Sequence, residues 1–179
     1  GDSLFKRVIE ETVIWLHSEM RCQSGGFYSS INADSENQEG KFYVWERDEI
    51  KKIIDSEDFN IIEKYYGLNE ETNFENRWHL TVSNDTENIA KDSKFENEKL
   101  EDIVKKCNKA LLKERKLRTP PSLDKKQLTS WNALVIKGLA VSGRVLERKD
   151  YIQSARESLE FIEKNQFDKN ILMACYINK

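Results

Sequence analysis

Apolar residues recur every three or four positions along much of the chain, which is the spacing of an amphipathic helix. Gly25 and Gly26 follow the first such stretch and Gly67 follows the third, as expected of helix-ending glycines. The prolines of TPPS at 119–122 end the fourth, because proline cannot donate to the helical hydrogen-bond ladder. The pattern predicts helices at about 3–21, 46–54, 57–66, 97–115, 127–147 and 150–165.

Short aromatic or β-branched runs lie between these helices or after the last one, and they predict β-like pieces at the loop ends. They are KFYVW at 41–45, HLTV at 79–82 and the tail NILMACYINK at 170–179. Residues 69–96 are otherwise polar and rich in asparagine, so we expect a long, mobile surface excursion there. The helix at 127–147 is apolar nearly all round, which predicts burial on several sides. The fold class is therefore mainly α, built from antiparallel helix pairs.

Composition narrows the class of protein. The chain has 179 residues, of which 38% are hydrophobic and 34% charged, enough for one globular domain with a core. No apolar run approaches the roughly 20 residues of a membrane span, and the first residues lack a signal-peptide pattern. A net charge of -3 with interleaved signs argues against nucleic acid as a partner. Three distant cysteines without a CxxC pair favour neither a disulfide scaffold nor a zinc site, so we expect a reducing cytoplasm.

The acid-rich stretch GGFYSSINADSENQEGKFYVW at 25–45 is the first candidate for chemistry. Asp34 and Glu36 stand at i and i+2, so in an extended loop both side chains would face one way and influence each other's protonation. Epimerisation or hydrolysis of a sugar requires such a paired acid and base. The alternative is that Asp34 and Ser35 cap a turn or a helix start, while Glu36 and Glu39 are solvated.

Aromatic and amide side chains near this stretch and near 131 are candidate sugar-binding groups. Tyr28, Tyr43, Trp45 and Trp131 present ring faces on which the apolar faces of a sugar can stack, with core packing as the alternative. Asn132 is a polar residue in an apolar helix, so it needs hydrogen-bond partners if it is buried. Its alternative role is to hold the 25–45 loop against the helix.

Three motifs, taken together, resemble one known family. The 25–45 stretch resembles the signature GGFYSAxDADSEGxEGKFYxW of the YyaL-like family, also named after spermatogenesis-associated protein 20. The stretch DKKQLTSWNALVIKGLAVSGR at 124–144 resembles that family's DDKxLTxWNGLMIxALAxAGR, and YYGLNEETNFENRWHL at 65–80 is similar to YGVxxxGNFEGxNxLH. The order and spacing of the motifs agree across most of the chain.

The resemblance implies that residues 1–179 are a segment of a single (α/α)6 toroid domain, related to N-acylglucosamine 2-epimerases and six-hairpin glycoside hydrolases. Family members also carry a thioredoxin-like domain, of which we expect no trace in this chain. Because half a toroid leaves helix faces uncovered, we expect self-association or association with the rest of a parent protein. We expect a sugar ligand, no cofactor, no metal, no nucleic acid and no membrane contact.

The candidate site combines the resemblance with the residue chemistry. We expect catalytic roles for Asp34, Glu36 and His79, the last of which occupies the family-like histidine position. We expect substrate binding by Tyr28, Trp45, Asp124, Lys126, Trp131 and Asn132. If the two motifs form one site, then Asp34, Glu36, Lys126, Trp131 and Asn132 should line a shared cleft.

Departures from the family pattern leave a second function open. Asn32 and Lys125 stand where the family has aspartates, and Ala133 replaces the glycine of WNG. Two carboxylates are therefore lost. The alternative to an epimerase-like or glycosidase-like domain is a non-catalytic interaction or regulatory module that keeps the toroid scaffold.

Overall fold

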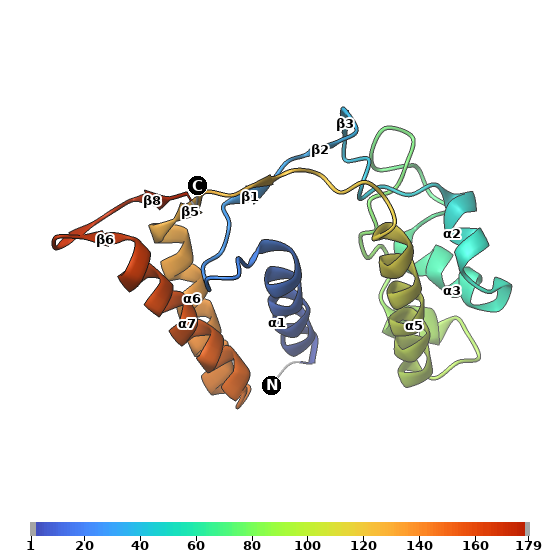
Figure 1. Cartoon of the computed structure of the whole chain (residues 1–179). Coiled ribbons are helices and arrows are strands. Elements are labelled where there is room, and N and C mark those ends of the chain that lie inside the picture. The colour runs from blue at the N-terminus through green and yellow to red at the C-terminus, as the bar shows by residue number, and fades with distance from the viewer. Residues whose placement is uncertain (1–2, 178–179) are drawn as a thin grey trace. The chain divides into compact units, whose positions relative to one another are not determined.

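The computed structural model describes residues 3–177, which are mainly helical, as the sequence predicts (Figure 1). The chain divides into two compact units. Unit 1 comprises residues 1–32 and 123–179, and unit 2 comprises residues 33–122. The toroid arrangement of the helices stays a prediction.

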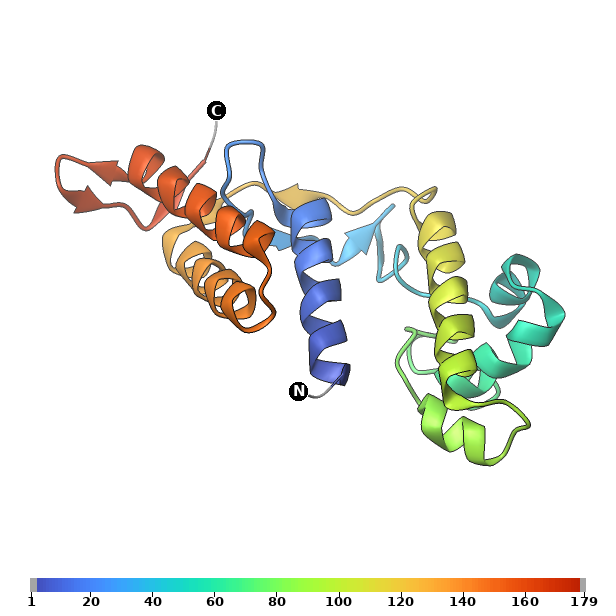
Figure 2. The same ribbon diagram turned by 90° about the horizontal axis from the view of Figure 1, so that it is seen from below.

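Unit 1 is built on a pair of packed helices, α6 (Thr129–Val145) and α7 (Lys149–Asn165), which lie side by side in Figure 2. The helix α1 (Ser3–Trp15) continues into a single π-helical turn, η1 (Leu16–Met20). Apolar residues of α1, η1, α6 and α7, together with Phe27 of the loop after η1, form the core of this unit: Val13, Met20, Phe27, Leu139, Tyr151 and Ala155.

Two-residue strands form three antiparallel pairs in unit 1. The strand β1 (Ser30–Ile31) pairs with β4 (Leu123–Asp124), and β5 (Gln127–Leu128) pairs with β8 (Cys175–Tyr176). The hairpin of β6 (Phe167–Asp168) and β7 (Ile171–Leu172) precedes β8. The β-like tail expected from the sequence is therefore confirmed.

Unit 2 packs short helices on one long helix. It contains α2 (Arg47–Ile53), α3 (Ser56–Tyr66), α4 (Thr86–Lys91) and α5 (Asn97–Arg115), preceded by the hairpin of β2 (Asp34–Ser35) and β3 (Gln38–Glu39). Ile50, Ile62 and Leu100 are fully buried at the centre of its core. Gly67 ends α3 in the left-handed conformation, with a φ of 64°, as the sequence predicts.

Several local expectations are wrong. Residues 41–43 of KFYVW are turn residues, and only Trp45 forms a bridge, with Trp78. HLTV at 79–82 contains no strand, because the backbone pairing is made one residue earlier, at Trp78. The polar excursion at 69–96 contains α4, whose start is capped by the Asp85 carboxylate accepting the Asn88 N–H at 2.7 Å.

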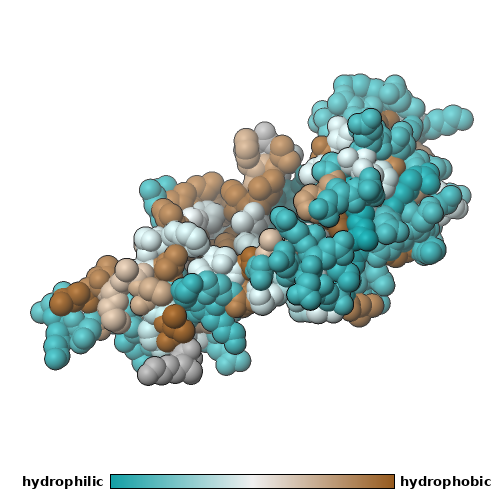
Figure 3. Space-filling model, turned by 90° about the horizontal axis from the view of Figure 1, so that it is seen from above, coloured by the Kyte–Doolittle hydropathy of each residue, from teal (hydrophilic) through white to brown (hydrophobic). Residues whose placement is uncertain are grey.

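The helix predicted at 127–147 also differs in its start and in its burial. It begins at Thr129, because Gln127 and Leu128 pair with β8 instead. Burial on several sides is not found in residues 3–177, since Leu134 and Val145 on α6 are 68% and 66% exposed. Brown hydrophobic surface is spread over the face of unit 1 shown in Figure 3.

No helix within residues 3–177 combines the length and the apolar character that crossing a membrane requires.

Candidate functional site

The acid-rich stretch forms a tight hairpin in unit 2. Asp34 pairs with Glu39 across β2 and β3, and the two turn residues, Glu36 and Asn37, have φ values of 54° and 61°. Positive φ at both central positions is the geometry of a type I′ turn, the turn that best matches the twist of two strands. Because Glu36 is a turn residue with positive φ, the expectation that Asp34 and Glu36 face one way in an extended loop is wrong.

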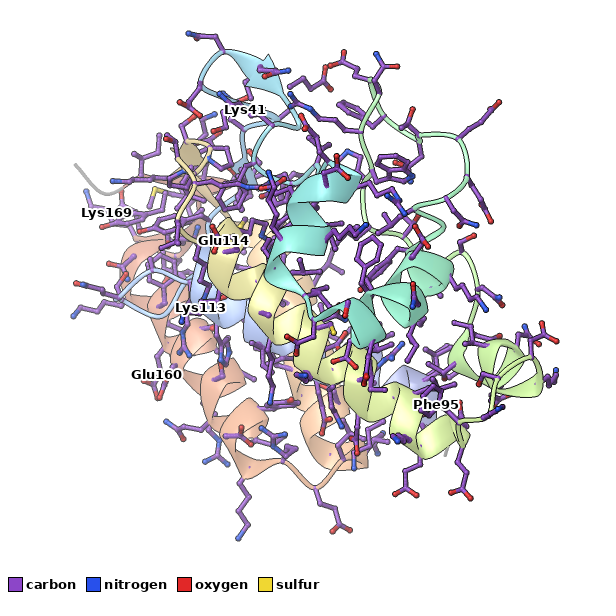
Figure 4. All side chains as sticks on the ribbon, turned by 90° about the vertical axis from the view of Figure 1, so that its right-hand side faces the viewer. Lys41, Phe95, Lys113, Glu114, Glu160 and Lys169 are labelled. Atoms are coloured by element: carbon purple, nitrogen blue, oxygen red, sulfur yellow. The ribbon has the colours of Figure 1, made fainter. Side chains whose placement is uncertain are left out.

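A cavity of about 500 Å³ lies beside this hairpin. Ser35 and Glu36 reach it from the hairpin, and Lys41, labelled in Figure 4, reaches it from the turn that follows. Ser35 is fixed in place because its hydroxyl donates to the Thr119 carbonyl at 2.5 Å. The complete lining is Ser35, Glu36, Lys41, Phe42, Val44, Glu46, Glu49, Arg77, Leu117, Arg118 and Thr119.

The charged groups of this cavity are matched in pairs. The lining includes three carboxylates and three cations, and each cation contacts a carboxylate of the same lining. The nitrogen–oxygen distances are 3.0 Å for Lys41–Glu36, 2.7 Å for Arg118–Glu49 and 3.6 Å for Arg77–Glu46. The lining therefore offers both donors and acceptors, and its carboxylates and cations are equal in number.

Arg118 holds one wall of the cavity together. Its Nη1 donates to the carbonyls of Phe42 at 3.0 Å and Val44 at 2.8 Å, while Nη2 pairs with Glu49. Its guanidinium also covers the Trp45 ring, 4.0 Å from the ring centroid. Trp45 is only 3% exposed and belongs to the core of unit 2, so core packing, the alternative given for this residue, is what the structure shows.

His79 is held near this region but does not line the cavity, although Arg77 does. The Asn73 side chain accepts the His79 N–H at 2.8 Å and donates to the His79 carbonyl at 2.9 Å. The His79 ring packs edge-on against Phe74, with 4.7 Å between centroids. The backbone of His79 is thus fixed by Asn73, and its ring rests on an aromatic neighbour.

In unit 1, the GGF segment and the LTSWN segment meet through Asn132. The Asn132 carbonyl oxygen accepts the Phe27 N–H at 2.7 Å, and its amide nitrogen donates to the Phe27 and Leu128 carbonyls, both at 3.0 Å. Asn132 is 1% exposed, and both hydrogens of its amide are used in these bonds. It holds the loop against the helix, which is the alternative given from the sequence.

Other buried polar side chains contact the segment that contains Gly25 and Gly26. The Ser158 hydroxyl donates to the Gly25 carbonyl at 2.8 Å, and Gln127 accepts the Cys22 thiol hydrogen at 3.3 Å. A Cβ at Gly26 would lie 2.3 Å from the Gln127 amide oxygen, so no larger residue fits there without displacement. Sequence reasoning missed Gln127 and Ser158. The polar positions 154 and 158, one turn apart on the buried face of α7, were the available signal.

Asp124 and Lys126 form a local turn at the end of β4. The Asp124 carboxylate accepts the Lys126 ammonium at 2.8 Å and the Lys126 N–H at 3.1 Å. These bonds lower the pKa of Asp124 and raise the pKa of Lys126.

Tyr28 is half-buried between two apolar clusters, and this burial, followed by the charge of Cys22, raises its pKa.

A second cavity, of about 680 Å³, lies in unit 1 between η1 and α7. His17 and Arg21 line it, together with Glu157, which pairs with Arg21. The His17 Nε2 lies 2.9 Å from the Ser154 hydroxyl. Burial, followed by the charge of Arg21, lowers the pKa of His17, so this imidazole is neutral at physiological pH.

The predicted site residues divide between the units. Unit 2 contains Asp34, Glu36, Trp45 and His79, and unit 1 contains Tyr28, Asp124, Lys126, Trp131 and Asn132. Of the three predicted catalytic residues, Glu36 lines the 500 Å³ cavity. Trp131 is 52% exposed, so its ring is open to a ligand or a partner. A cleft shared by all five residues named from the sequence stays a prediction.

The chain is similar to known animal proteins over almost its whole length. It is 28% identical to spermatogenesis-associated protein 20 of Homo sapiens over 204 residues, covering 98% of this chain and 26% of the human protein. It is also 28% identical to the Rattus norvegicus protein of that name, over 94% of this chain and 24% of the relative. An uncharacterized protein of Caenorhabditis elegans is 27% identical over 79% of this chain.

The chain thus spans about a quarter of the length of the curated relatives it matches. No family model matches the chain.

Proposed function

We propose that the chain, which is similar to spermatogenesis-associated protein 20 over nearly its whole length, is a carbohydrate-binding segment of a larger toroid protein of that family. The ligand site is the cavity beside the β2–β3 hairpin, with Glu36 as one of its three carboxylates. The observation that carries the proposal is the matched set of three carboxylates and three cations in one cavity wall.

A sugar fits this wall for a chemical reason. Each sugar hydroxyl both donates and accepts a hydrogen bond, so a paired carboxylate and cation can serve one hydroxyl from both sides. A charged ligand would need a surplus of the opposite charge, and the wall has none. Phe42 and Leu117 provide apolar surface for the C–H faces of a ring.

The size of the cavity agrees with this ligand class. A volume of about 500 Å³ falls within the range of roughly 300–1,000 Å³ that is typical of small-molecule sites. Arg118 keeps the site preformed, because its guanidinium is held by two carbonyls, a carboxylate and the Trp45 ring. A preformed wall lowers the entropic cost of binding.

The proposal extends to chemistry in the larger protein. There, Asp34, Glu36 and His79 would supply the acid and base of an epimerase-like or glycosidase-like reaction. In unit 1, Tyr28, Asp124, Lys126 and Trp131 are proposed as sugar-contacting groups separate from this cavity, with Asn132 as a positioning residue that fixes the loop at Phe27. The cytoplasm is the location that the three free cysteines favour.

A second candidate function is a non-catalytic interaction or regulatory module that keeps the toroid scaffold. It is favoured by Asn32 and Lys125, which stand at positions where the family that this chain resembles has carboxylates. The Glu36 carboxylate is also already paired with the Lys41 ammonium, at 3.0 Å. Sugar binding is therefore tested first and turnover second.

The test of binding uses the 179-residue chain and saturation-transfer NMR with a panel of mono- and disaccharides. Glu36→Gln keeps the size of the side chain but removes its charge, and should weaken binding at least about tenfold. The matched control is Glu71→Gln, an exposed glutamate of unit 2 outside the cavity lining.

Binding of no sugar at millimolar concentration would overturn the proposal, as would equal affinities of the Glu36→Gln variant and the wild type. Epimer or hydrolysis products from the larger protein, detected by NMR, would separate the enzyme from the non-catalytic module.

A further inference from the structure

An apolar stripe runs along the exposed side of α6. Leu134, Gly138, Val141 and Val145 follow one another at intervals of four, three and four residues, which places them on one helix face. Leu134 is 68% exposed, Val141 46% and Val145 66%. Trp131, one turn before Leu134, continues the stripe at 52% exposure. Exposed apolar residues in a continuous row mark an interaction surface more often than scattered ones do.

The two glycines of α6 behave differently. A Cβ at Gly143 would lie 2.8 Å from the Ile152 side chain and 3.0 Å from the Arg148 carbonyl, so this glycine permits the close approach of α7. A Cβ at Gly138 would meet no neighbouring heavy atom of residues 3–177 within 4 Å. Glycine inside a helix lowers its stability relative to alanine. The close packing of α7 compensates for this at Gly143, and the described residues offer no such compensation at Gly138.

The charged residues of α6 are all basic. Lys137 and Arg144 lie one heptad apart, along one flank of the stripe, and both are exposed. No ion pair within residues 3–177 involves either of them. A partner that covers the stripe would therefore gain from carboxylates placed along its own flank.

We infer that the Leu134–Val145 stripe is the docking surface for an amphipathic helix with acidic flanks, supplied by sequence outside these 179 residues. Gly138 lets this helix approach closely, as Gly143 does for α7, and Lys137 and Arg144 pair with its carboxylates. Such sequence is plentiful in the relatives, because the matched region is only 26% of the human protein. A second copy of α6 fits poorly, because α6 contains no acidic residue that could pair with Lys137 and Arg144.

Two synthetic helical peptides test the inference on the 179-residue chain. Both carry leucine at the stripe positions, and their flanks carry either glutamate or lysine. Fluorescence anisotropy should show that the glutamate peptide binds at least about tenfold more tightly than the lysine peptide. Gly138→Leu fills the open space, and Val141→Asp places a charge in the stripe. Each variant should bind the glutamate peptide at least about tenfold more weakly than the wild type does. Both positions are exposed, so the variants are expected to fold.

The control variant is Leu112→Asp, an exposed leucine of α5 outside the stripe, which should leave peptide affinity unchanged. Equal affinity of the two peptides would overturn the acidic partner. Unchanged affinity in Gly138→Leu and Val141→Asp would overturn the stripe as the surface. A dimer in sedimentation equilibrium that Val141→Asp dissociates would assign the stripe to a second copy of this chain and overturn the inference.

Discussion

The Asn132 side chain forms hydrogen bonds with both the N–H and the carbonyl of Phe27. The two residues lie 105 positions apart in sequence, in the two motifs that resemble one family. The amide completes the backbone hydrogen bonding of a buried loop residue, and at the same time its second hydrogen reaches the Leu128 carbonyl. This pairing fixes the GGF segment on the first turn of α6.

Asn132→Ala should destabilise the chain by about 2–4 kcal/mol, because it leaves a buried N–H and a buried carbonyl at Phe27 without partners. Urea unfolding followed by circular dichroism measures the loss. Asn165→Ala is the control, since the Asn165 amide donates only to the Phe161 carbonyl of its own helix. We expect less than about 1 kcal/mol there. Equal losses for the two variants would show that the hydrogen bonds with Phe27 contribute no more to the free energy of unfolding than the Asn165 bond does.

Replacing the two glycines of α6 by alanine should change the free energy of unfolding in opposite directions. Gly138→Ala should raise the free energy of unfolding by about 0.5–1 kcal/mol, because the new methyl group enters open space and alanine favours the helix. Gly143→Ala should lower it by about 1–3 kcal/mol, because the methyl group collides with Ile152. Thermal unfolding of both variants gives the comparison. Destabilisation by Gly138→Ala would mean that this position is covered.

Substitutions in the β2–β3 turn should stabilise the chain and at the same time abolish sugar binding at the proposed site. Replacing Glu36 by asparagine and Asn37 by glycine gives the pair that type I′ turns favour, and both positions have positive φ. We expect the double variant to gain about 0.5–1 kcal/mol in stability. It should lose sugar binding, because the Glu36 carboxylate is gone from the cavity. Asn37→Gly alone, which keeps that carboxylate, should gain stability and retain binding.

Alkaline pH should weaken unit 2 through Cys107. Burial, followed by the charge of Asp58, raises the pKa of this thiol from 9.0 to about 11. The unfolded chain therefore releases the proton first, so stability is complete below about pH 9 and falls as pH rises toward 11. We expect a loss of roughly 1–2 kcal/mol over this interval. Urea midpoints measured at pH 8 to 11 should fall less steeply in Cys107→Ala, and parallel curves would contradict this assignment.

The sequence predicts the long helices well, because their signals are local. Gly67 ends α3 in the left-handed conformation, and the prolines after α5 stop it before the strand β4. The same local reasoning fails where contact with a distant segment determines the secondary structure. Gln127 and Leu128 have helical spacing with α6, but pairing with β8 draws them into a strand. α4 is missed because its six residues carry only one buried side chain, Ile89, and the Asp85 cap is its main signal.

The site is less predictable than the fold for the same reason. The need of Asn132 for partners follows from its place in an apolar helix, yet the identity of Phe27 as that partner depends on the tertiary structure. The extended geometry assumed for Asp34 and Glu36 fails, because turn residues with positive φ were not marked by a glycine. The roles of Arg118 and Glu49 depend on a contact across 69 positions, which no local pattern encodes.

The most direct test of sugar binding beside the hairpin is a ¹H–¹⁵N correlation spectrum of the chain during titration with the panel of sugars. The account predicts chemical-shift changes at the amides of Ser35, Glu36, Lys41 and Phe42, together with Arg118 and Thr119, for at least one sugar. It predicts none at the second cavity, around His17 and Glu157. Shifts confined to the His17 and Glu157 region, or no shifts with any sugar at millimolar concentration, would contradict it.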